Sequence, residues 1–196
     1  LVREGVIICS GTTIGENSVV GHGVVLRRGV RIGRDTVISH NTTIEREVVI
    51  GDNVRISALT HLTVACLLED DVEIGARVVT INDNELRWRR ADQVLKPPIF
   101  RRGCRVGSGV TVLSGIEVGE RTLVGAGAVV TRNLPANVVA YGVPAYVSST
   151  YIFLFILFGA FLEQAGMISL FNDFAMGTVG HTRGGPAKVS VISSGL

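Results

Sequence analysis

The stretch IEREVVIGDNVRISALTHLTVACLLEDDVEI (residues 44–74) has a branched aliphatic residue at every sixth position. The same period extends back to the second residue and covers thirteen consecutive steps without an exception. The thirteen residues are Val2, Ile8, Ile14, Val20, Leu26, Ile32, Ile38, Ile44, Ile50, Ile56, Leu62, Leu68 and Ile74. A period of six fits neither a helix nor a simple strand and is typical of hexapeptide solenoids. The sequence therefore predicts stacked triangular coils of about eighteen residues, each made of three hexads that contribute parallel strands.

The period is interrupted once. It stops at Thr80 and resumes at Phe100 with a shift of two residues, and residues 80–99 (TINDNELRWRRADQVLKPPI) have no hexad phase. The resumed steps are Phe100, Val106, Val112, Val118, Val124 and Val130, which gives nineteen hexads and roughly six coils, closed by Pro135 and Pro144. Long loops on rigid scaffolds often carry function, so we expect a functional site at this insertion.

Composition excludes some classes of protein. Hydrophobic residues make up 46% of the chain and charged residues 18%, which argues against a disordered chain. A net charge of +2 gives no global case for nucleic-acid binding. The three cysteines are an odd count, which argues against a disulfide scaffold and favours a reducing, cytoplasmic compartment. Cys66 and Cys104 fall at the fifth hexad position with several Ser and Thr residues, so we expect small side chains buried in the core there.

Glycine recurs at the second hexad position. The residues are Gly15, Gly21, Gly33, Gly51 and Gly75. We expect a tight turn with unusual backbone angles at this position, since glycine adopts such angles without a steric penalty.

The last fifty residues have a different character. YIFLFILFGAFL (residues 151–162) is a charge-free apolar run that is followed by Glu163 and Gln164. Twelve residues are few for a membrane span and fit a buried or interfacial helix better. We therefore predict two parts: an all-β solenoid over residues 1–147 with its loop at 80–99, and an apolar, helical tail over residues 148–196. We expect the tail to cap the last coil, or to contact the inner membrane if it belongs to the native protein.

Several stretches resemble a known family. They are GDNVRI (51–56), LEDDVEIG (68–75), TINDN (80–84), LKPP (95–98), RRGCRVGSGVTVLSGIEVG (101–119) and VGAGAVVTRNLPANVVAYGVPA (124–145). These residues resemble the left-handed parallel β-helix of the hexapeptide-repeat acyltransferases, and are most similar to the N-acetyltransferases of nucleotide-linked amino sugars. Left-handedness is implied by this resemblance alone, because general sterics favour right-handed crossovers.

The resemblance implies a function and a site. It implies acetyl-CoA as the acyl donor, a nucleotide-sugar substrate, a homotrimer with acetyl-CoA lying between two chains, and no metal. Asn82 and Asp83 would orient the substrate amine. The implied cofactor-binding residues are Gly109, Ser114, Gly115, Ala126, Gly127 and Arg132.

Other candidates come from the residue types. His61 is a candidate general base, because imidazole has an unperturbed pKa of about 6.5, and the hexad phase predicts a coil corner for it. His22 and His40 are eighteen residues apart, which predicts a solvated ladder on one outer face. Residues 86–105 contain seven basic residues and one carboxylate, so Arg87 and Arg90 are candidate phosphate ligands. Trp88 is a candidate for stacking on a base. The alternatives are a solvated charged loop, and a tryptophan that anchors the loop on the coils.

A hexapeptide solenoid can also serve other functions. A non-catalytic hexapeptide scaffold and the solenoid end of a sugar nucleotidyltransferase stay open. A zinc lyase of the carbonic anhydrase type needs closely spaced histidines, and no pair here has that spacing. Separately, FGAFLEQAG (158–166) and GHTRGGPAKVSVISS (180–194) make residues 150–196 resemble a fragment of the large membrane subunit of tripartite (TRAP) dicarboxylate transporters. Because such a segment has no ordinary place after an acyltransferase, we expect a joined or truncated reading frame.

Overall fold

The computed structural model describes residues 1–85, 94–142, 157–158 and 161, and divides the chain into two compact units, Leu1–Pro144 and Ala145–Leu196. In the second unit Leu157, Phe158 and Phe161 are helical, and the rest of the predicted tail lies outside the described residues. Within the described part of the chain, no helix has the length and apolarity needed to cross a membrane.

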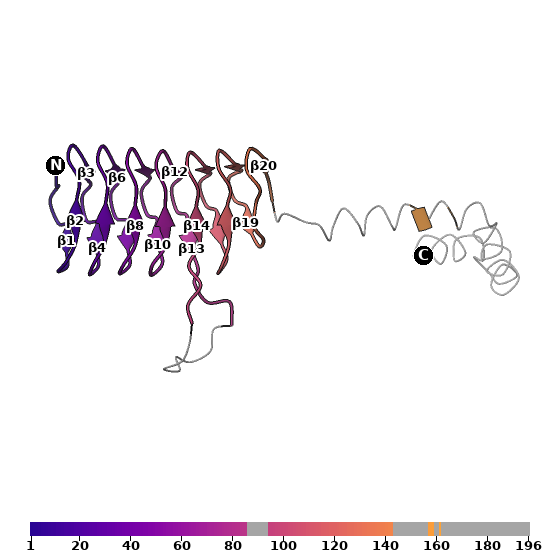
Figure 1. The fold of residues 1–196 in the computed structure, drawn as a ribbon, viewed down its shortest axis with the longest axis horizontal. Coiled ribbons are helices and arrows are strands. Elements are labelled where there is room, and N and C mark those ends of the chain that lie inside the picture. Colours follow the sequence, from indigo (N-terminus) through magenta and orange to yellow (C-terminus); the bar gives the residue numbers. More distant parts are fainter. Residues whose placement is uncertain (86–93, 143–156, 159–160, 162–196) are drawn as a thin grey trace, which may run out of the picture. The chain divides into compact units, whose positions relative to one another are not determined.

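Over its described residues, the first unit is a solenoid of twenty two-residue parallel strands in three sheets, and the strands stack along one axis (Figure 1). Sheet 1 contains β1 (Ile7–Ile8), β4 (Val25–Leu26), β7 (Thr43–Ile44), β10 (His61–Leu62), β13 (Val79–Thr80), β16 (Thr111–Val112) and β19 (Val129–Val130). Sheet 2 contains β2 (Thr13–Ile14), β5 (Arg31–Ile32), β8 (Val49–Ile50), β11 (Leu67–Leu68), β14 (Ile99–Phe100) and β17 (Glu117–Val118). Sheet 3 contains β3 (Val19–Val20), β6 (Val37–Ile38), β9 (Arg55–Ile56), β12 (Glu73–Ile74), β15 (Arg105–Val106), β18 (Leu123–Val124) and β20 (Val139–Ala140). The predicted all-β solenoid is confirmed.

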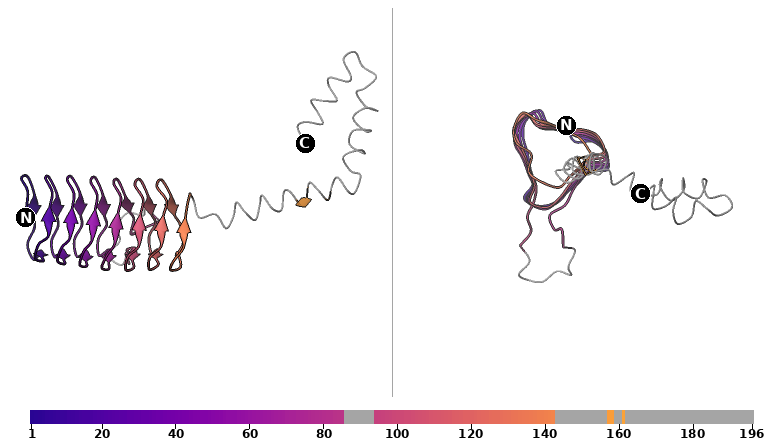
Figure 2. Two further views of the ribbon diagram at one scale, coloured as in Figure 1. Left: turned by 90° about the horizontal axis from the view of Figure 1, so that it is seen from above. Right: turned by 90° about the vertical axis from the view of Figure 1, so that its right-hand side faces the viewer.

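Each coil passes from sheet 1 to sheet 2 to sheet 3, and the coils superpose on a three-sided outline when seen along the axis (Figure 2). We call the corner between sheets 1 and 2 edge 1–2, and the corner between sheets 3 and 1 edge 3–1. The coil repeat is eighteen residues in most of the column, as in the pairing of Arg31 with Val49.

The aliphatic ladder forms a core that runs the length of the column. Its members are buried from Val20 onward, whereas Val2 and Ile8 in the first coil are 47% exposed. The fifth hexad position also points inward, and its hydroxyls donate to a carbonyl of the next coil, as from Thr36 to Gly51 (3.0 Å). Small inward residues at this position were predicted correctly.

Two cysteines occupy the same inward position. Cys66 and Cys104 are buried and free, as predicted. Burial raises the pKa of the Cys66 thiol far above its ordinary value and that of Cys104 to about 12. Both thiols are therefore protonated near neutral pH and are inert as nucleophiles.

The glycines of the second hexad position have a different role from the one predicted. Their backbone angles are ordinary, but a Cβ on Gly75 would lie 2.5 Å from the Ser108 nitrogen, and one on Gly15 would lie 2.5 Å from the Gly33 carbonyl carbon. These glycines therefore allow close approach of neighbouring coils. The left-handed backbone angles occur two residues later, at a position that holds Asn53 (φ 54°) and Leu59 (φ 61°) in some hexads and glycines such as Gly29 (φ 73°) in others.

The insertion lengthens one coil by fourteen residues. Leu67 pairs with Ile99, thirty-two residues later, where an uninterrupted coil has eighteen. Fourteen is two hexads plus two residues, which accounts for the shifted phase. The extra residues leave the column at edge 1–2 (Figure 2).

The column has about seven turns, more than the six predicted, because the closing segment continues the coil. β20 pairs with β18, and Leu134 forms a bridge with Val118. In both pairs the partners are sixteen residues apart, so the segment around Pro135 makes a shortened coil.

Candidate active site

His61 lies in the middle of the outer face of sheet 1. It is the first residue of β10, half-buried, and is flanked in the register by Thr43 and Val79. The predicted coil corner is wrong, because the residue before each core aliphatic lies in a strand and faces outward. His22 and His40, by contrast, are exposed and occupy equivalent positions two residues after β3 and β6.

The ladder between β10 and β13 breaks where the loop begins. His61 pairs with Val79, but the pairing does not extend to Thr80. In the preceding coils, the N–H of the residue after a sheet 1 strand donates to a main-chain carbonyl of the next strand in the sheet, as Glu45 does to Leu62 (3.0 Å). At the equivalent position the Thr63 N–H donates instead to the Thr80 hydroxyl (2.8 Å), which in turn donates to the His61 carbonyl (3.3 Å).

The two ends of the loop converge on one corner of the next coil. The Ser114 N–H donates to the Asn84 side-chain oxygen (3.0 Å), and the Asn84 amide donates back to the Ser114 carbonyl (3.5 Å). On the other side, the Lys96 carbonyl accepts from the Gly115 N–H (2.7 Å) and from the Ser114 hydroxyl (3.0 Å). The Lys96 N–H closes the base of the loop by donating to the Asn82 carbonyl (3.0 Å).

Edge 1–2 therefore collects several of the predicted site residues. Asn82 and Asp83 leave the column there, and Ser114 and Arg132 lie two residues after β16 and β19 in successive coils of the same edge. The Asp83 carboxylate accepts the Glu85 N–H (2.9 Å), which forms a local turn. Within the part of the chain that the structure describes, the half-buried side-chain amide of Asn82 has no hydrogen-bond partner.

His61 and Asn82 are neighbours across one coil step. Asn82 follows Val79 by three residues, and Val79 stands beside His61 in the ladder. Extended-chain rise and strand spacing put their Cα atoms roughly 11 Å apart. That separation is too long for a direct contact, but a small group between the two side chains could reach both.

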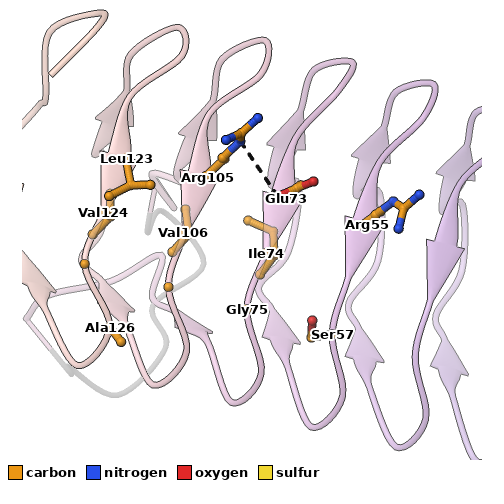
Figure 3. Close-up of a pocket in the computed structure, with 12 residues that line it drawn as sticks. Arg55, Ser57, Glu73, Ile74, Gly75, Arg105, Val106, Leu123, Val124 and Ala126 are labelled. Carbon is orange, nitrogen blue, oxygen red and sulfur yellow. Dashed lines mark ion pairs between the residues drawn. The ribbon is translucent and has the colours of Figure 1, made fainter. Parts of the chain in front are cut away.

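The remaining predicted cofactor residues lie on edge 3–1. The Gly109 N–H donates to the Ala76 carbonyl and the Gly127 N–H to the Ser108 carbonyl (both 2.8 Å), so both donors belong to the coil ladder. Ala126 lines an open groove of about 570 Å³ along this edge and the outer face of sheet 3 (Figure 3). Gly75 and Gly107 are also in its lining.

The groove is flanked by a charged ladder. Arg55, Glu73 and Arg105 stand in neighbouring strands of sheet 3, and Arg105 Nε lies 3.8 Å from Glu73 Oε2 (Figure 3). The pair is exposed, so its contribution to stability is small.

The basic stretch at residues 86–105 is less cationic than its sequence indicates. Arg101 contacts Glu69 (2.8 Å) and Glu117 (2.7 Å), and Arg102 contacts Asp70 (2.7 Å). Hydrogen bonds from Arg101 hold the pKa of Glu69 and of Glu117 below the ordinary carboxyl value. These arginines belong to the coils and are neutralised by carboxylates of adjacent coils, so they do not support phosphate binding by the loop.

The predicted substrate residues Arg87, Trp88 and Arg90 lie outside the described residues. Across residues 1–85 and 94–142, His, Cys, Asp and Glu form no group that could hold a metal ion.

We call residues 80–84 and Lys96, together with the Ser114–Gly115 corner that they contact, the loop base. Thr80 and Asn84 belong to it but were not among the predicted site residues. One signal pointed to Thr80: it stands at a core position that is aliphatic in the thirteen preceding hexads. Asn84 stands in the TINDN stretch (80–84), but its role could not be predicted from the sequence, because its partner is a backbone group thirty residues away.

Comparison with known protein families supports the repeat. A family profile described as "Hexapeptide repeat of succinyl-transferase" matches residues 4–28 and 11–46. The solenoid is a hexapeptide-repeat β-helix. The predicted resemblance to hexapeptide-repeat acyltransferases is thus confirmed.

Individual relatives of the β-helix are acetyltransferases. Galactoside O-acetyltransferase of Lactococcus lactis is 39% identical over 59 residues, which cover 30% of this chain and 28% of the relative. The dTDP-3-amino-3,6-dideoxy-alpha-D-galactopyranose 3-N-acetyltransferase of Aneurinibacillus thermoaerophilus is 43% identical over 47 residues, covering 24% of each. The chain thus spans less than a third of the length of these curated relatives.

Among solved structures, PerB from Caulobacter crescentus in complex with CoA and GDP-perosamine is 28% identical. The match covers 71% of this chain and 56% of PerB, with a TM-score of 0.35.

The resemblance to transporters in the tail is confirmed as well. A profile described as "Tripartite ATP-independent periplasmic transporter, DctM component" matches residues 117–196. The match begins earlier than the predicted residue 150 and includes β17 to β20 of the β-helix.

Proposed function

We propose that this chain transfers an acetyl group from acetyl-CoA to the amino group of a nucleotide-linked amino sugar. The observation that supports this most is the loop base at edge 1–2. It holds Asn82, whose side-chain amide has no hydrogen-bond partner among the described residues, one coil step from the outward-facing His61. The sequence relatives support the acetyl donor, and the resemblance of residues 80–84 to amino-sugar enzymes supports the acceptor.

The reaction needs a positioned amine rather than a strong base. The amine lone pair attacks the thioester carbonyl carbon, the C–S bond breaks, and the CoA thiolate leaves. Asn82 accepts a hydrogen bond from the amine and so directs its lone pair toward the thioester. His61 receives the proton that the nitrogen loses, either directly or through a water molecule, and returns it to solvent.

The residues predicted to bind acetyl-CoA lie on two edges of the column. Gly109, Ala126 and Gly127 are on edge 3–1, whereas Ser114 and Arg132 are on edge 1–2, across the width of sheet 1. A homotrimer would bring edge 3–1 of one chain against edge 1–2 of the next. Acetyl-CoA then lies along the groove of one chain, beside the loop of its neighbour. The three free cysteines fit a reducing, cytoplasmic location for these substrates.

A second candidate, O-acetylation of a sugar, is favoured by relatives such as the galactoside O-acetyltransferase. The two reactions make different demands on His61. A hydroxyl must lose its proton as it attacks, whereas an unprotonated amine already has a free lone pair. His61→Asn should therefore abolish O-transfer and only slow N-transfer.

Thiol release from acetyl-CoA tests the proposal. Release should depend on an amino-sugar nucleotide and should be absent with the same nucleotide sugar carrying a hydroxyl in place of the amine. Release with the hydroxyl acceptor alone would favour the second candidate. No release, together with no CoA binding by calorimetry, would reduce the chain to a non-catalytic scaffold.

A further inference from the structure

We propose that Thr80 and Asn84 are positioning residues, which fix the backbone on either side of Asn82 and so aim its side chain without touching the substrate. The proposal rests on the proposed function for its catalytic consequence. Its structural part stands on contacts in the loop base.

At Thr80 the side-chain hydroxyl, rather than the main-chain carbonyl, accepts the hydrogen bond from the coil of β10. Thr80 is 2% exposed, occupies a core position of its hexad, and pairs with Val112 of the next coil. The Thr63 N–H would donate to the Thr80 carbonyl in a regular coil, and here donates to the Thr80 hydroxyl. The hydroxyl thus satisfies the buried donor and frees the main chain after β13 from its ladder with β10.

Asn84 makes a second side-chain contact that holds the loop. Elsewhere in the column, corner N–H groups are capped by side chains of a neighbouring coil, as Asp52 caps the Arg34 N–H (2.8 Å). At Ser114 the cap comes from the loop residue Asn84. The loop is therefore attached to the next coil by a cap of the kind that links coils at other corners.

Asn82 lies between these two attachments. Its carbonyl is held by the Lys96 N–H, and the Lys96 carbonyl is held in turn by the Ser114–Gly115 corner. Main-chain freedom at Asn82 is thus removed from both sides, while its side-chain amide stays unpaired among the described residues. An amide fixed in this way is preorganised to orient an acceptor.

Substitutions at Thr80 separate positioning from stability. Thr80→Ser keeps the hydroxyl but loses a methyl group from the core, whereas Thr80→Val keeps the volume and loses the hydroxyl. We expect Thr80→Val to lower kcat with the amino-sugar acceptor on the order of tenfold at unchanged KM for acetyl-CoA, as a small misplacement of a reacting group does. Thr80→Ser should keep turnover within about twofold of the parent even if it melts earlier.

Thr36→Val is the matched control for Thr80→Val. The Thr36 hydroxyl makes the same two kinds of buried bond, to the Gly51 carbonyl (3.0 Å) and from the Val54 N–H (3.1 Å), in coils remote from the loop. Its kcat should be unchanged. The proposal is overturned if Thr80→Val keeps full turnover, or if Thr80→Ser loses as much as Thr80→Val.

Amide hydrogen exchange tests the same proposal without an assay for activity. Asn84→Ala should speed exchange at Ser114, Gly115 and Lys96 by at least about tenfold, while the Ile81 amide, which donates to Val112, stays protected. Asp52→Ala, the control, should speed exchange at Arg34 only. Unchanged exchange at Ser114 in Asn84→Ala would refute the attachment. If the parent protein transfers no acetyl group, the proposed function fails, and the exchange experiment still decides whether Asn84 holds the loop.

Discussion

At the scale of single residues, the hexad has two positions that favour glycine, for different physical reasons. The second position faces the backbone of the next coil, and a Cβ on Gly75 would lie 2.5 Å from the Ser108 nitrogen. The position two residues later has left-handed angles, and at Gly127 (φ 71°) it also has open space, because a Cβ there would meet nothing within 4 Å. Leu59 and Ala65 already occupy equivalent positions.

Substitution by alanine should therefore have unequal effects on stability. Gly75→Ala forces two coils apart and should lower the free energy of unfolding by about 2–3 kcal/mol, as overpacking does. Gly127→Ala should lower it by about 1 kcal/mol, the usual penalty of a left-handed angle. Urea denaturation measures both values, and equal losses would contradict the assignment of close packing to the second position.

The cysteines give a second prediction at this scale. Cys66 and Cys104 are buried and have raised pKa values, whereas Cys9 is partly exposed. A thiol reagent at pH 8 should modify only Cys9 in the native protein and all three thiols after denaturation. Rapid modification of three thiols in the native state would show that the core position is not closed.

At the scale of elements, the coils bearing the loop are tied together by ion pairs. Arg101 donates from Nε to Glu117 and from Nη1 to Glu69, and so connects three successive strands of sheet 2 at their ends. Both carboxylates have lowered pKa values, for which the hydrogen bond to Arg101 is the main cause. Groups with a depressed pKa stabilise the fold above their unfolded-state pKa and lose that contribution as the pH falls.

Replacing Arg101 should therefore have an effect that depends on pH. Arg101→Met should lower the urea midpoint at pH 7, and the difference from the parent should shrink as the pH falls below about 4.3, the ordinary pKa of glutamate. Denaturation curves at several pH values measure this. A difference that stays constant from pH 7 to pH 3 would show that packing of the arginine stem, rather than the ion pairs, stabilises the coils.

The sequence predicted elements of the column well and contacts of the loop base poorly. Periodicity is a local property, so the aliphatic ladder and the shift of two at Phe100 revealed the strands and the insertion. The predicted position of His61 was wrong because the hexad phase alone does not show which residues of a hexad lie in the strand and which lie at the corner. The role of Asn84 depends on a partner thirty residues away, and the pairing of Arg101 depends on carboxylates of two other coils.

At the scale of the whole molecule, the residues predicted to bind acetyl-CoA lie at the two opposite edges of sheet 1. If the site is shared between chains, chains with different defects should restore each other. Asn82→Ala damages the loop edge, and Ala126→Leu would fill the groove at edge 3–1. In randomly mixed trimers of the two variants, about a quarter of the sites would combine intact edges, because each site draws its edges from neighbouring subunits.

Acetyl transfer by the mixed sample should therefore recover to about a quarter of the parent rate, while each variant alone stays nearly inactive. Unfolding and refolding the two variants together, with refolding apart as the control, gives the comparison. No recovery from a mixture that forms mixed trimers would mean that each site lies within one chain.

The central claim is that the loop base at edge 1–2 carries out acetyl transfer to an amine. The most direct measurement is kcat for acetylation of an amino-sugar nucleotide, compared between the parent protein and Asn82→Ala, with acetyl-CoA affinity measured on both by calorimetry. The account predicts a fall in kcat on the order of tenfold or more at unchanged acetyl-CoA affinity, because Asn82 orients only the acceptor. Equal kcat in the two proteins would contradict it.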